Sequence, residues 1–326
     1  MRLAELPRVR LAELPTPLQR APRLSEALGV EVLVKRDDLT GLGLGGNKVR
    51  ILEPLLGEAL EAGADVVLTA GGAQSNHAAL TALAAARLGL EAHLVRYGSE
   101  RPVAHEGNAA LSALAGARVT WTGDPDRSSV DPALERLADE LRARGRMPYV
   151  VPRGGATALG ATAYVRASLE LALQLDELGV APSRVVVATG SCGTQAGLVA
   201  GPLALGARHR VVGVTVSRPR EECLRRVRTL AADCLALLGV DAAEPEPEVL
   251  DGYIGPGYGR PSEGGRSAAT LAARTEGLVL DPVFTAKAMA ALVERAGEDG
   301  GPVVFWHTGG GATAVAAAML GDGGEL

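Results

Sequence analysis

Lysine and aromatic residues are both scarce in this chain. Only three of its 33 basic residues are lysines, namely Lys35, Lys48 and Lys287, and aromatic residues make up 3% of the 326 positions. The core must therefore be built from Ala, Val and Leu. Lysine is the basic residue whose amine can be neutralised and used as a nucleophile, because arginine stays protonated. Since a compositional bias toward arginine explains most of this scarcity, the position of each lysine tells more than its rarity.

Other absences exclude whole classes of protein. The three cysteines form no Cys-x-x-Cys pair, which favours a reducing cytoplasm over a disulfide framework. The five histidines show no His-x-x-x-His spacing, so we expect no metal site. A formal net charge of −5 with no basic run argues against nucleic-acid binding. Early charges interrupt the N-terminus, so we expect no signal peptide.

Long uncharged windows such as Val66–Ala86 invite a membrane interpretation, which we reject. Each window carries several glycines and polar residues near its middle. Lipid could not satisfy the backbone of such a loop. A buried strand, a glycine-rich loop and a helix explain these windows better.

Short apolar runs alternate with longer helical patterns along the chain. The expected strands are 32–35, 66–69, 92–96, 118–121, 149–151, 185–188, 211–216 and 303–306, and the expected helices are 49–62, 78–88, 132–144, 159–178, 220–238 and 287–296. This alternation predicts an α/β protein whose mostly parallel sheets are covered by helices on both faces. The segment 242–249, acidic and interrupted by prolines, reads as a solvated connector. At this length two lobes are expected.

Lys48 ends a glycine-rich loop, Gly41-Leu-Gly-Leu-Gly-Gly-Asn-Lys48. The loop matches Gly-x-Gly-x-x-Gly, but Asp37-Asp-Leu-Thr40 stands between it and the preceding strand, and Asp65 stands before the next strand instead of at its end. A nicotinamide site is therefore disfavoured. The remaining interpretations are a flexible loop and a loop that presents a reactive amine.

Four more loops carry polar residues after strands. Gln74-Ser-Asn-His77 could be a simple helix cap or could present polar groups to an anion. Gly190-Ser-Cys-Gly-Thr194 suits a phosphate cradle without being a Walker loop, and packing is the better interpretation of Cys192. His307-Thr308-Gly309 and Gly255-Pro-Gly-Tyr258-Gly259 add a hydroxyl and a phenol. A lysine amine with a phosphate cradle and no metal motif points to pyridoxal 5'-phosphate (PLP), a phosphate-bearing aldehyde.

In combination these motifs resemble a known family. Val34-Lys-Arg-Asp-Asp38, Gly45-Gly-Asn-Lys48, Gln74-Ser-Asn-His77, Gly190-Ser-Cys-Gly-Thr194, Gly255-Pro-Gly-Tyr-Gly259, Leu280-Asp-Pro-Val-Phe-Thr285 and His307-Thr-Gly-Gly310 occur in the order typical of the D-cysteine desulfhydrase and 1-aminocyclopropane-1-carboxylate (ACC) deaminase family. The resemblance implies the fold-type II, tryptophan-synthase-β-like architecture, with two three-layer αβα domains. It also implies a large PLP-binding domain of residues 1–51 plus 160–326, an inserted small domain of residues 52–159, and a homodimer.

The resemblance also implies roles for individual residues. Lys48 would form the Schiff base with PLP and move the Cα proton, with Ser75 and Tyr258 as further catalytic residues. The remaining cofactor-binding residues would be Asn47, Asn76, Gly190, Ser191, Cys192, Gly193, Thr194 and Thr285, the last facing the pyridine nitrogen. The small amino-acid substrate would meet Ser75, Asn76, His77, Tyr258, Phe284, Thr308 and Gly309.

Departures from the family pattern bear on the substrate. Phe284 stands where the family usually has tyrosine, Thr285 stands where ACC deaminases carry glutamate, and Ala79 and Leu80 replace an arginine and a glutamine typical of desulfhydrases. A threonine hydroxyl does not keep the pyridine nitrogen of PLP protonated as a carboxylate does, so the cofactor ring is a weaker electron sink. A weaker sink suits the loss of a good leaving group such as a thiol. The leading expectation is a PLP-dependent lyase that converts D-cysteine to pyruvate, sulfide and ammonia. The alternatives are L-cysteate cleavage, ACC deamination, a β-replacement or biosynthetic PLP enzyme that acts on a different small amino acid, and a non-catalytic amino-acid or PLP-binding protein.

Overall fold

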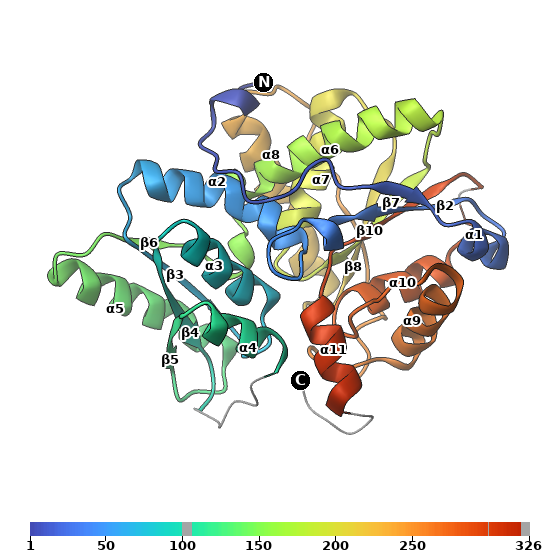
Figure 1. Ribbon diagram of the computed structural model, residues 1–326. Coiled ribbons are helices and arrows are strands. Elements are labelled where there is room, and N and C mark those ends of the chain that lie inside the picture. The colour runs from blue at the N-terminus through green and yellow to red at the C-terminus, as the bar shows by residue number, and fades with distance from the viewer. Residues whose placement is uncertain (100–105, 299, 321–326) are drawn as a thin grey trace.

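The computed structural model describes residues 1–99, 106–298 and 300–320 and contains two β-sheets, each flanked by helices (Figure 1). A six-stranded sheet takes its strands from both ends of the sequence, and a four-stranded sheet lies entirely between them in sequence. In the ranges described, no helix is long and apolar enough to cross a membrane.

The six-stranded sheet has the order β1-β2-β10-β7-β8-β9. Its strands are β1 (Leu18–Arg20), β2 (Val32–Arg36), β7 (Arg184–Thr189), β8 (Arg210–Thr215), β9 (Glu248–Leu250) and β10 (Val303–His307). Only β1 runs antiparallel to its neighbour, and the other pairings are parallel. The continuous apolar run of β7 is buried along its whole length, as expected for a strand with both faces covered.

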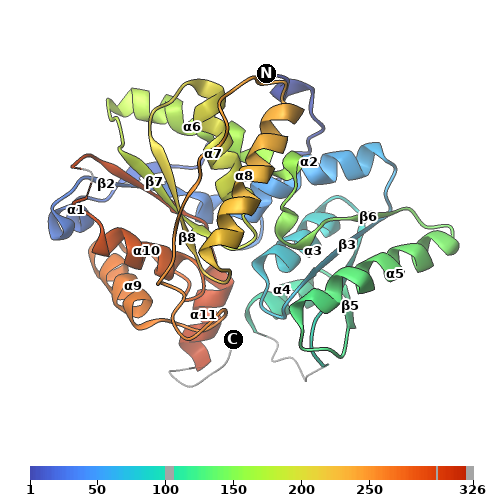
Figure 2. The same ribbon diagram turned by 180° about the vertical axis from the view of Figure 1, so that it is seen from behind.

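Helices cover both faces of this sheet, which gives three layers. Val185 and Val187 of β7 point into a core shared with α2 (Asn47–Glu61), α6 (Ala158–Leu178), α7 (Gly193–Leu205) and α8 (Arg220–Leu237). The alternate residues Val186 and Ala188 join a second core with α1 (Pro22–Leu28), α9 (Glu263–Glu276) and α10 (Thr285–Glu294). Figure 2 shows α6, α7 and α8 on one side of the strands and α9 and α10 on the other.

The four-stranded sheet has the order β5-β4-β3-β6 and is parallel throughout. Its strands are β3 (Val66–Gly71), β4 (Glu91–Arg96), β5 (Arg118–Trp121) and β6 (Pro148–Val150). Helix α5 (Val130–Ala143) packs on one face of β3, and α3 (Asn76–Arg87) lies in the core on the other. The remaining helices are α4 (Gly107–Leu114) and α11 (Gly311–Leu320), and the 3-10 turns are η1 (Leu3–Glu5), η2 (Asp37–Leu39), η3 (Arg127–Ser129) and η4 (Arg153–Gly155).

The expected α/β architecture is confirmed, and one local prediction is wrong. The segment 242–249 is not a connector throughout, because its end forms β9, whose Glu248 and Val249 pair with Val212 and Gly213 of β8. Tertiary pairing overrides the acidic, proline-interrupted composition there. The expected domain limits at residues 51/52 and 159/160 fall inside α2 and α6, and the division stays a prediction.

A buried carboxylate fixes the start of α2. Asp37 accepts hydrogen bonds from Arg50 Nε at 2.9 Å, the Tyr164 hydroxyl at 2.7 Å and Trp306 Nε1 at 2.8 Å. The Tyr164 hydroxyl also lies 3.2 Å from the carbonyl oxygen of Asn47, the first residue of α2. Groups from three parts of the fold therefore hold the residue that precedes Lys48.

Candidate active site

A pocket forms where strands of both sheets reach their carboxyl ends. Ala70 and Gly71 end β3, Ala188 and Thr189 end β7, and all four residues line the pocket. This position is the usual ligand site of open α/β sheets. Most of the expected site residues come together here, namely Asn47, Lys48, Ser75, Asn76, His77, Gly190, Ser191, Cys192, Thr194, Tyr258, Phe284 and Thr308.

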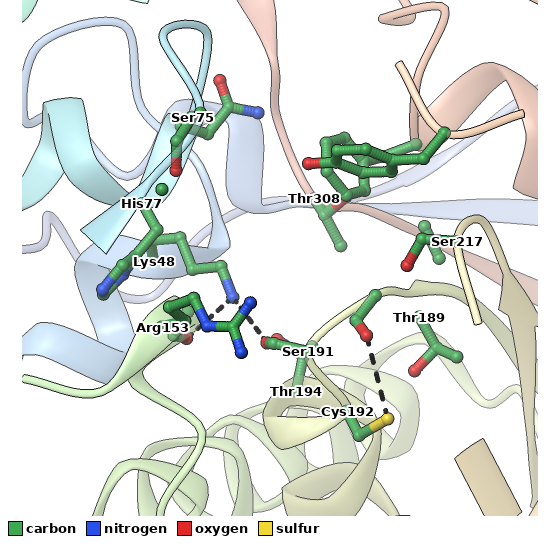
Figure 3. Close-up of a pocket in the computed structure, with 18 of the residues that line it drawn as sticks. Lys48, Ser75, His77, Arg153, Thr189, Ser191, Cys192, Thr194, Ser217 and Thr308 are labelled. Carbon is green, nitrogen blue, oxygen red and sulfur yellow. Dashed lines mark hydrogen bonds between the residues drawn. The ribbon is translucent and has the colours of Figure 1, made fainter. Parts of the chain in front are cut away.

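Lys48 presents its amine inside this pocket (Figure 3). Its Nζ donates to the carbonyl oxygen of Gly154 at 2.9 Å and lies 3.3 Å from Ser191 Oγ. Burial lowers the pKa of Lys48 to about 8. A substantial fraction of the amine is therefore neutral near physiological pH and free to act as a nucleophile or base.

The two other lysines have structural roles outside the pocket. Lys35 Nζ contacts Glu170, Gln174 and the carbonyl oxygen of Thr16. Lys287 Nζ donates to the carbonyl oxygens of Ile254 and Gly257. Lys48 is thus the one lysine of the three that lines the pocket.

The N-terminus of α7 provides a cradle for an anion. The helix begins at Gly193, so its first backbone N–H groups have no partner within the helix. Its N-cap, Cys192, has a φ of 77°, the one positive φ of a non-glycine residue in the described ranges. A hydrogen bond with Cys223, together with burial, raises the pKa of the Cys192 thiol. Cys192 therefore packs as a neutral side chain and does not act as a thiolate.

Side chains complete this cradle. Asn47 Nδ2 donates to Thr194 Oγ1 at 2.9 Å and ties the start of α2 to the start of α7. The buried hydroxyl of Thr189 lines the pocket and has no partner among the described residues. An unpartnered buried hydroxyl marks a place for a ligand group.

The N-terminus of α3 forms a second polar wall. Ser75 is its N-cap, and its hydroxyl accepts the Ala78 backbone N–H at 3.2 Å. Asn76 Oδ1 accepts from Asn108 Nδ2 at 2.6 Å and from the Thr313 hydroxyl at 3.3 Å. These contacts use the amide oxygen and leave Asn76 Nδ2 as the group that can donate to a ligand.

His77 is held neutral beneath the same wall. Its Nε2 lies 3.0 Å from the Thr69 hydroxyl, which itself donates to the carbonyl oxygen of Val151 at 2.8 Å. Nε2 must therefore carry the ring proton, and Nδ1 has no partner among the described residues. Burial, followed by the charge of Lys48, lowers the pKa of His77 to about 3. The ring is thus an uncharged acceptor at neutral pH.

Two aromatic rings form a further wall of the pocket. Tyr258 and Phe284 meet edge to face, with centroids 6.1 Å apart. The Arg127 guanidinium carbon lies 4.2 Å from the centroid of the Tyr258 ring. Confinement within the cleft raises the pKa of the Tyr258 phenol to about 12, although the ring keeps 37% of its surface exposed. Its hydroxyl is therefore protonated at neutral pH and can donate a hydrogen bond.

Comparison with known proteins decides the family. The family described as pyridoxal-phosphate dependent enzyme matches residues 9–309. The chain belongs to this PLP-dependent family. A D-cysteine desulfhydrase of Klebsiella pneumoniae is 44% identical over 321 residues, which cover 94% of this chain and 95% of the relative. A putative ACC deaminase of Pyrococcus abyssi is 42% identical over 310 residues, which cover 94% and 93%.

Solved structures agree with this assignment. A crystal structure of an ACC deaminase homologue superposes with a TM-score of 0.89 at 42% identity and covers 95% of this chain and 94% of its own. A threonine deaminase from T.th. superposes with a TM-score of 0.67 at 22% identity, covers 91% and 92%, and supports the fold alone. The protein is therefore a PLP-dependent lyase of the D-cysteine desulfhydrase and ACC deaminase family with the fold-type II architecture.

The pocket fits the PLP cofactor of this family. A desolvated lysine amine suits its aldehyde, and the α7 N-terminus with Ser191 and Thr194 suits its phosphate. The close packing of the Gly154 backbone against Ser191 and Lys48 requires a glycine. A Cβ on Gly154 would lie 2.5 Å from the Ser191 side chain and 3.5 Å from Lys48 Nζ. The role of each residue toward the cofactor stays a prediction.

Three expected site residues do not line the PLP-family pocket. Gly193 faces Ala156, and Gly309 packs against Gly46. Thr285 is fully buried, where its hydroxyl donates to Asp281 Oδ1 and accepts the Asp281 N–H, both at 2.7 Å. Asp281, the carboxylate that the Thr285 hydroxyl contacts, itself lines the pocket.

Sequence reasoning missed Asp281 and the arginines Arg127, Arg153 and Arg218. Arg218 follows the end of β8, so the rule that ligands lie at strand ends could have found it. Asp281 lies within a motif that was recognised for its threonine. Arg127 and Arg153 come from the 3-10 turns η3 and η4, which carry no periodic signal.

Proposed function

We infer that the protein catalyses β-elimination from D-cysteine to give pyruvate, hydrogen sulfide and ammonium. The observation that carries this proposal is the position of Lys48, whose desolvated amine lies between the α7 anion cradle and the polar start of α3. The similarity to a D-cysteine desulfhydrase at 44% identity supports it. When bound, PLP captures the substrate amine and delocalises the electron pair left after loss of the Cα proton.

Lys48 has two tasks in this proposal. Its neutral amine is the covalent attachment point for the cofactor and, once displaced, the base that accepts the Cα proton. The carbonyl oxygen of Gly154, 2.9 Å away, orients Nζ. Burial keeps the pKa close to the operating pH, where a base is most effective.

The start of α3 holds the substrate carboxylate. Ser75, Asn76 and His77 line the pocket at this helix N-terminus, which favours a negative charge. The hydrogen bond from Asn108 uses Oδ1 of Asn76, so Nδ2 of the same amide remains available to donate to the substrate. The neutral ring of His77 adds no charge that would compete for the carboxylate.

The residues of the aromatic wall favour β-elimination over opening of a cyclopropane ring. Tyr258 is protonated at neutral pH and can donate to a departing sulfur. Phe284 offers no hydroxyl, so the pocket has one phenol fewer at this wall for attack on a cyclopropane. These features favour a substrate with a good leaving group over ACC.

A substrate panel tests the proposal. Purified protein saturated with PLP is assayed for keto-acid release from D- and L-cysteine, D- and L-cysteate, D-serine, β-chloroalanine and ACC, with sulfide measured for the cysteines. We expect D-cysteine to show the highest kcat/KM and pyruvate and sulfide to appear in equal amounts. Equal or faster turnover of ACC would overturn the proposal, and sulfide without pyruvate would indicate β-replacement.

Replacement of Lys48 tests the residue that carries the proposal. Lys48→Ala should remove the borohydride-sensitive visible absorption of the PLP protein and reduce turnover by about three orders of magnitude or more, because anchor and base are lost together. Lys48→Arg is the matched control for charge and should be equally inactive. Unchanged turnover in either variant would rule out this role of Lys48.

A further inference from the structure

Three arginines line the pocket, and they differ in their partners. Arg153 pairs with Asp131 at 2.7 Å, and Arg218 pairs with Glu222 and donates from Nε to the carbonyl oxygen of Gly190 at 3.1 Å. Arg127 also lines the pocket, but no carboxylate pairs with it in the described ranges. Its charge is the one of the three that protein carboxylates leave uncompensated.

Arg127 is positioned from both sides of the pocket. It begins η3, whose N-cap Asp126 accepts the Ser128 N–H at 2.9 Å. Arg153 Nη1 donates to the carbonyl oxygen of Arg127 at 3.0 Å and holds its backbone. Across the cleft, the Tyr258 ring faces the guanidinium carbon at 4.2 Å, well within the range of cation–π attraction.

This arrangement places a cation beside the phenol of Tyr258 in the same pocket as Lys48. With the substrate amine at Lys48 and the carboxylate at Ser75 and Asn76, the lining left for the β-substituent includes the Tyr258 phenol with the Arg127 guanidinium beside it. In Figure 3, Lys48, Ser75 and His77 lie on one side of the pocket and Thr308 and Ser217 on the other. A β-substituent that reaches the Tyr258 ring meets the positive charge of Arg127 there.

We propose that Arg127 is a specificity-determining residue that binds the negative charge of a sulfur-containing β-substituent, either the thiolate of cysteine or the sulfonate of cysteate. This proposal rests on the β-elimination proposed above and names the class of leaving group that the site selects. It assigns to the lobe of the four-stranded sheet a direct part in substrate choice. A cation placed where charge develops stabilises the transition state as well as the bound anion.

The step that Arg127 assists is cleavage of the Cβ–S bond. The Cα–H bond breaks and its proton passes to Lys48, then the Cβ–S bond breaks and its electron pair leaves on sulfur. For cysteine and water the products are pyruvate, ammonium and hydrogen sulfide. For cysteate and water they are pyruvate, ammonium and hydrogen sulfite. Neither reaction needs an oxidant or reductant.

The kinetic test compares leaving groups in Arg127→Met and Arg127→Lys. In Arg127→Met, kcat/KM for cysteine and cysteate should fall about tenfold or more, since a charge-stabilising donor is lost. For cysteate, which is anionic before reaction, much of the loss should appear in KM. Activity toward β-chloroalanine should change less than about threefold, because chloride leaves with little help. Arg127→Lys should recover part of the loss.

Arg144→Met is the matched control. Arg144 is an exposed arginine at the C-cap of α5, on the side of the four-stranded sheet, and its side chain is 72% exposed. Its replacement should leave all substrates unaffected. An equal fall for cysteine, cysteate and β-chloroalanine in Arg127→Met would show that Arg127 only supports Tyr258, and would overturn the proposal.

A binding measurement separates this proposal from the proposed reaction. Calorimetric titration of cysteate and of alanine is carried out on Lys48→Ala proteins with and without Arg127→Met, so that no turnover occurs. The dissociation constant for cysteate should rise about tenfold with Arg127→Met, and that for alanine should not change. Equal constants for cysteate, or no binding of cysteate to the Lys48→Ala protein with Arg127 intact, would overturn the role of Arg127. A wild type that binds PLP but converts none of the panel would overturn the reaction alone.

Discussion

At the scale of single residues, the site depends on desolvation. Lys48, His77 and Tyr258 all have pKa values moved toward the neutral form, and burial is the leading cause for each. With a pKa of about 8, Lys48 is reactive near neutral pH. With a pKa of about 3, His77 stays uncharged, and with a pKa of about 12, the Tyr258 phenol stays protonated. The site thus assigns base and acid by burial, with few direct ion pairs.

The lowered pKa of Lys48 predicts how the cofactor-free protein captures PLP. Only the neutral amine attacks an aldehyde, so the second-order rate constant should rise about tenfold per pH unit below the pKa. It should level off above pH of about 8. Stopped-flow absorbance between pH 6 and 10 measures this profile, with N-acetyl-lysine amide as the reference amine. A protein profile that keeps rising in parallel with the reference amine would contradict the prediction.

At the scale of elements, continuous apolar strands and strand-end glycines were readable from the sequence. The run at Val185–Ala188 became β7, and the glycine-rich motif after it became the start of α7. The short strands β1 and β9 were missed, because Leu18-Gln-Arg20 and Glu248-Val-Leu250 carry polar residues in place of a continuous apolar run and their pairing comes from other strands. The sequence could not predict which way the Thr285 hydroxyl points, because its direction is set by the hydrogen bond to Asp281.

The packing of α7 against α6 predicts the effect of one methyl group. A Cβ on Gly197 would lie 2.2 Å from the Ala161 carbonyl oxygen and 2.5 Å from Tyr164 Cβ. Gly197→Ala should therefore push the two helices apart and lower the free energy of unfolding by about 1–3 kcal/mol. Because Tyr164 contacts Asn47, PLP should also bind more weakly. Urea denaturation and fluorescence titration with PLP measure the two effects.

Gly264→Ala is the matched control for that change. Gly264 is also a helical glycine, in α9, but its nearest neighbour would be Ala290 Cβ at 3.7 Å, an ordinary contact. Alanine there should leave PLP affinity unchanged and stabilise the protein by about 0.5–1 kcal/mol through helix propensity. Equal stability of the two variants would show that α6 and α7 have room to adjust.

At the scale of the whole molecule, a buried charge network joins distant parts of the chain. Glu170 of α6 pairs with Lys35 of β2 and with Arg50 of α2, and it accepts the Thr16 N–H at 2.9 Å. Arg50 in turn reaches Asp37. Breaking such a pair on one side leaves an uncompensated buried charge. The network therefore couples the stability of the six-stranded sheet to the position of α2 and so of Lys48.

Glu170 gives this network a dependence on pH. Burial raises the pKa of Glu170, but the hydrogen bond and charge of Arg50, followed by Lys35, outweigh it and lower the pKa from 4.5 to about 2. Because the folded-state pKa is the lower one, the stabilisation is complete above the unfolded pKa and is lost as pH falls from about 4.5 to about 2. Glu170→Gln should cost about 3 kcal/mol at pH 7, since Arg50 and Lys35 lose a partner.

The difference between wild type and Glu170→Gln should then shrink as the pH falls through that window. Urea denaturation at pH 7, 4.5 and 3 measures it, and Glu177→Gln serves as the control because Glu177 is an exposed residue of the same helix. That control should stay within about 0.5 kcal/mol of wild type at every pH. A Glu170→Gln difference that is constant from pH 7 to 3 would mean that the loss comes from packing and not from charge. It would also remove electrostatics as the means by which the core holds α2 and Lys48 in place.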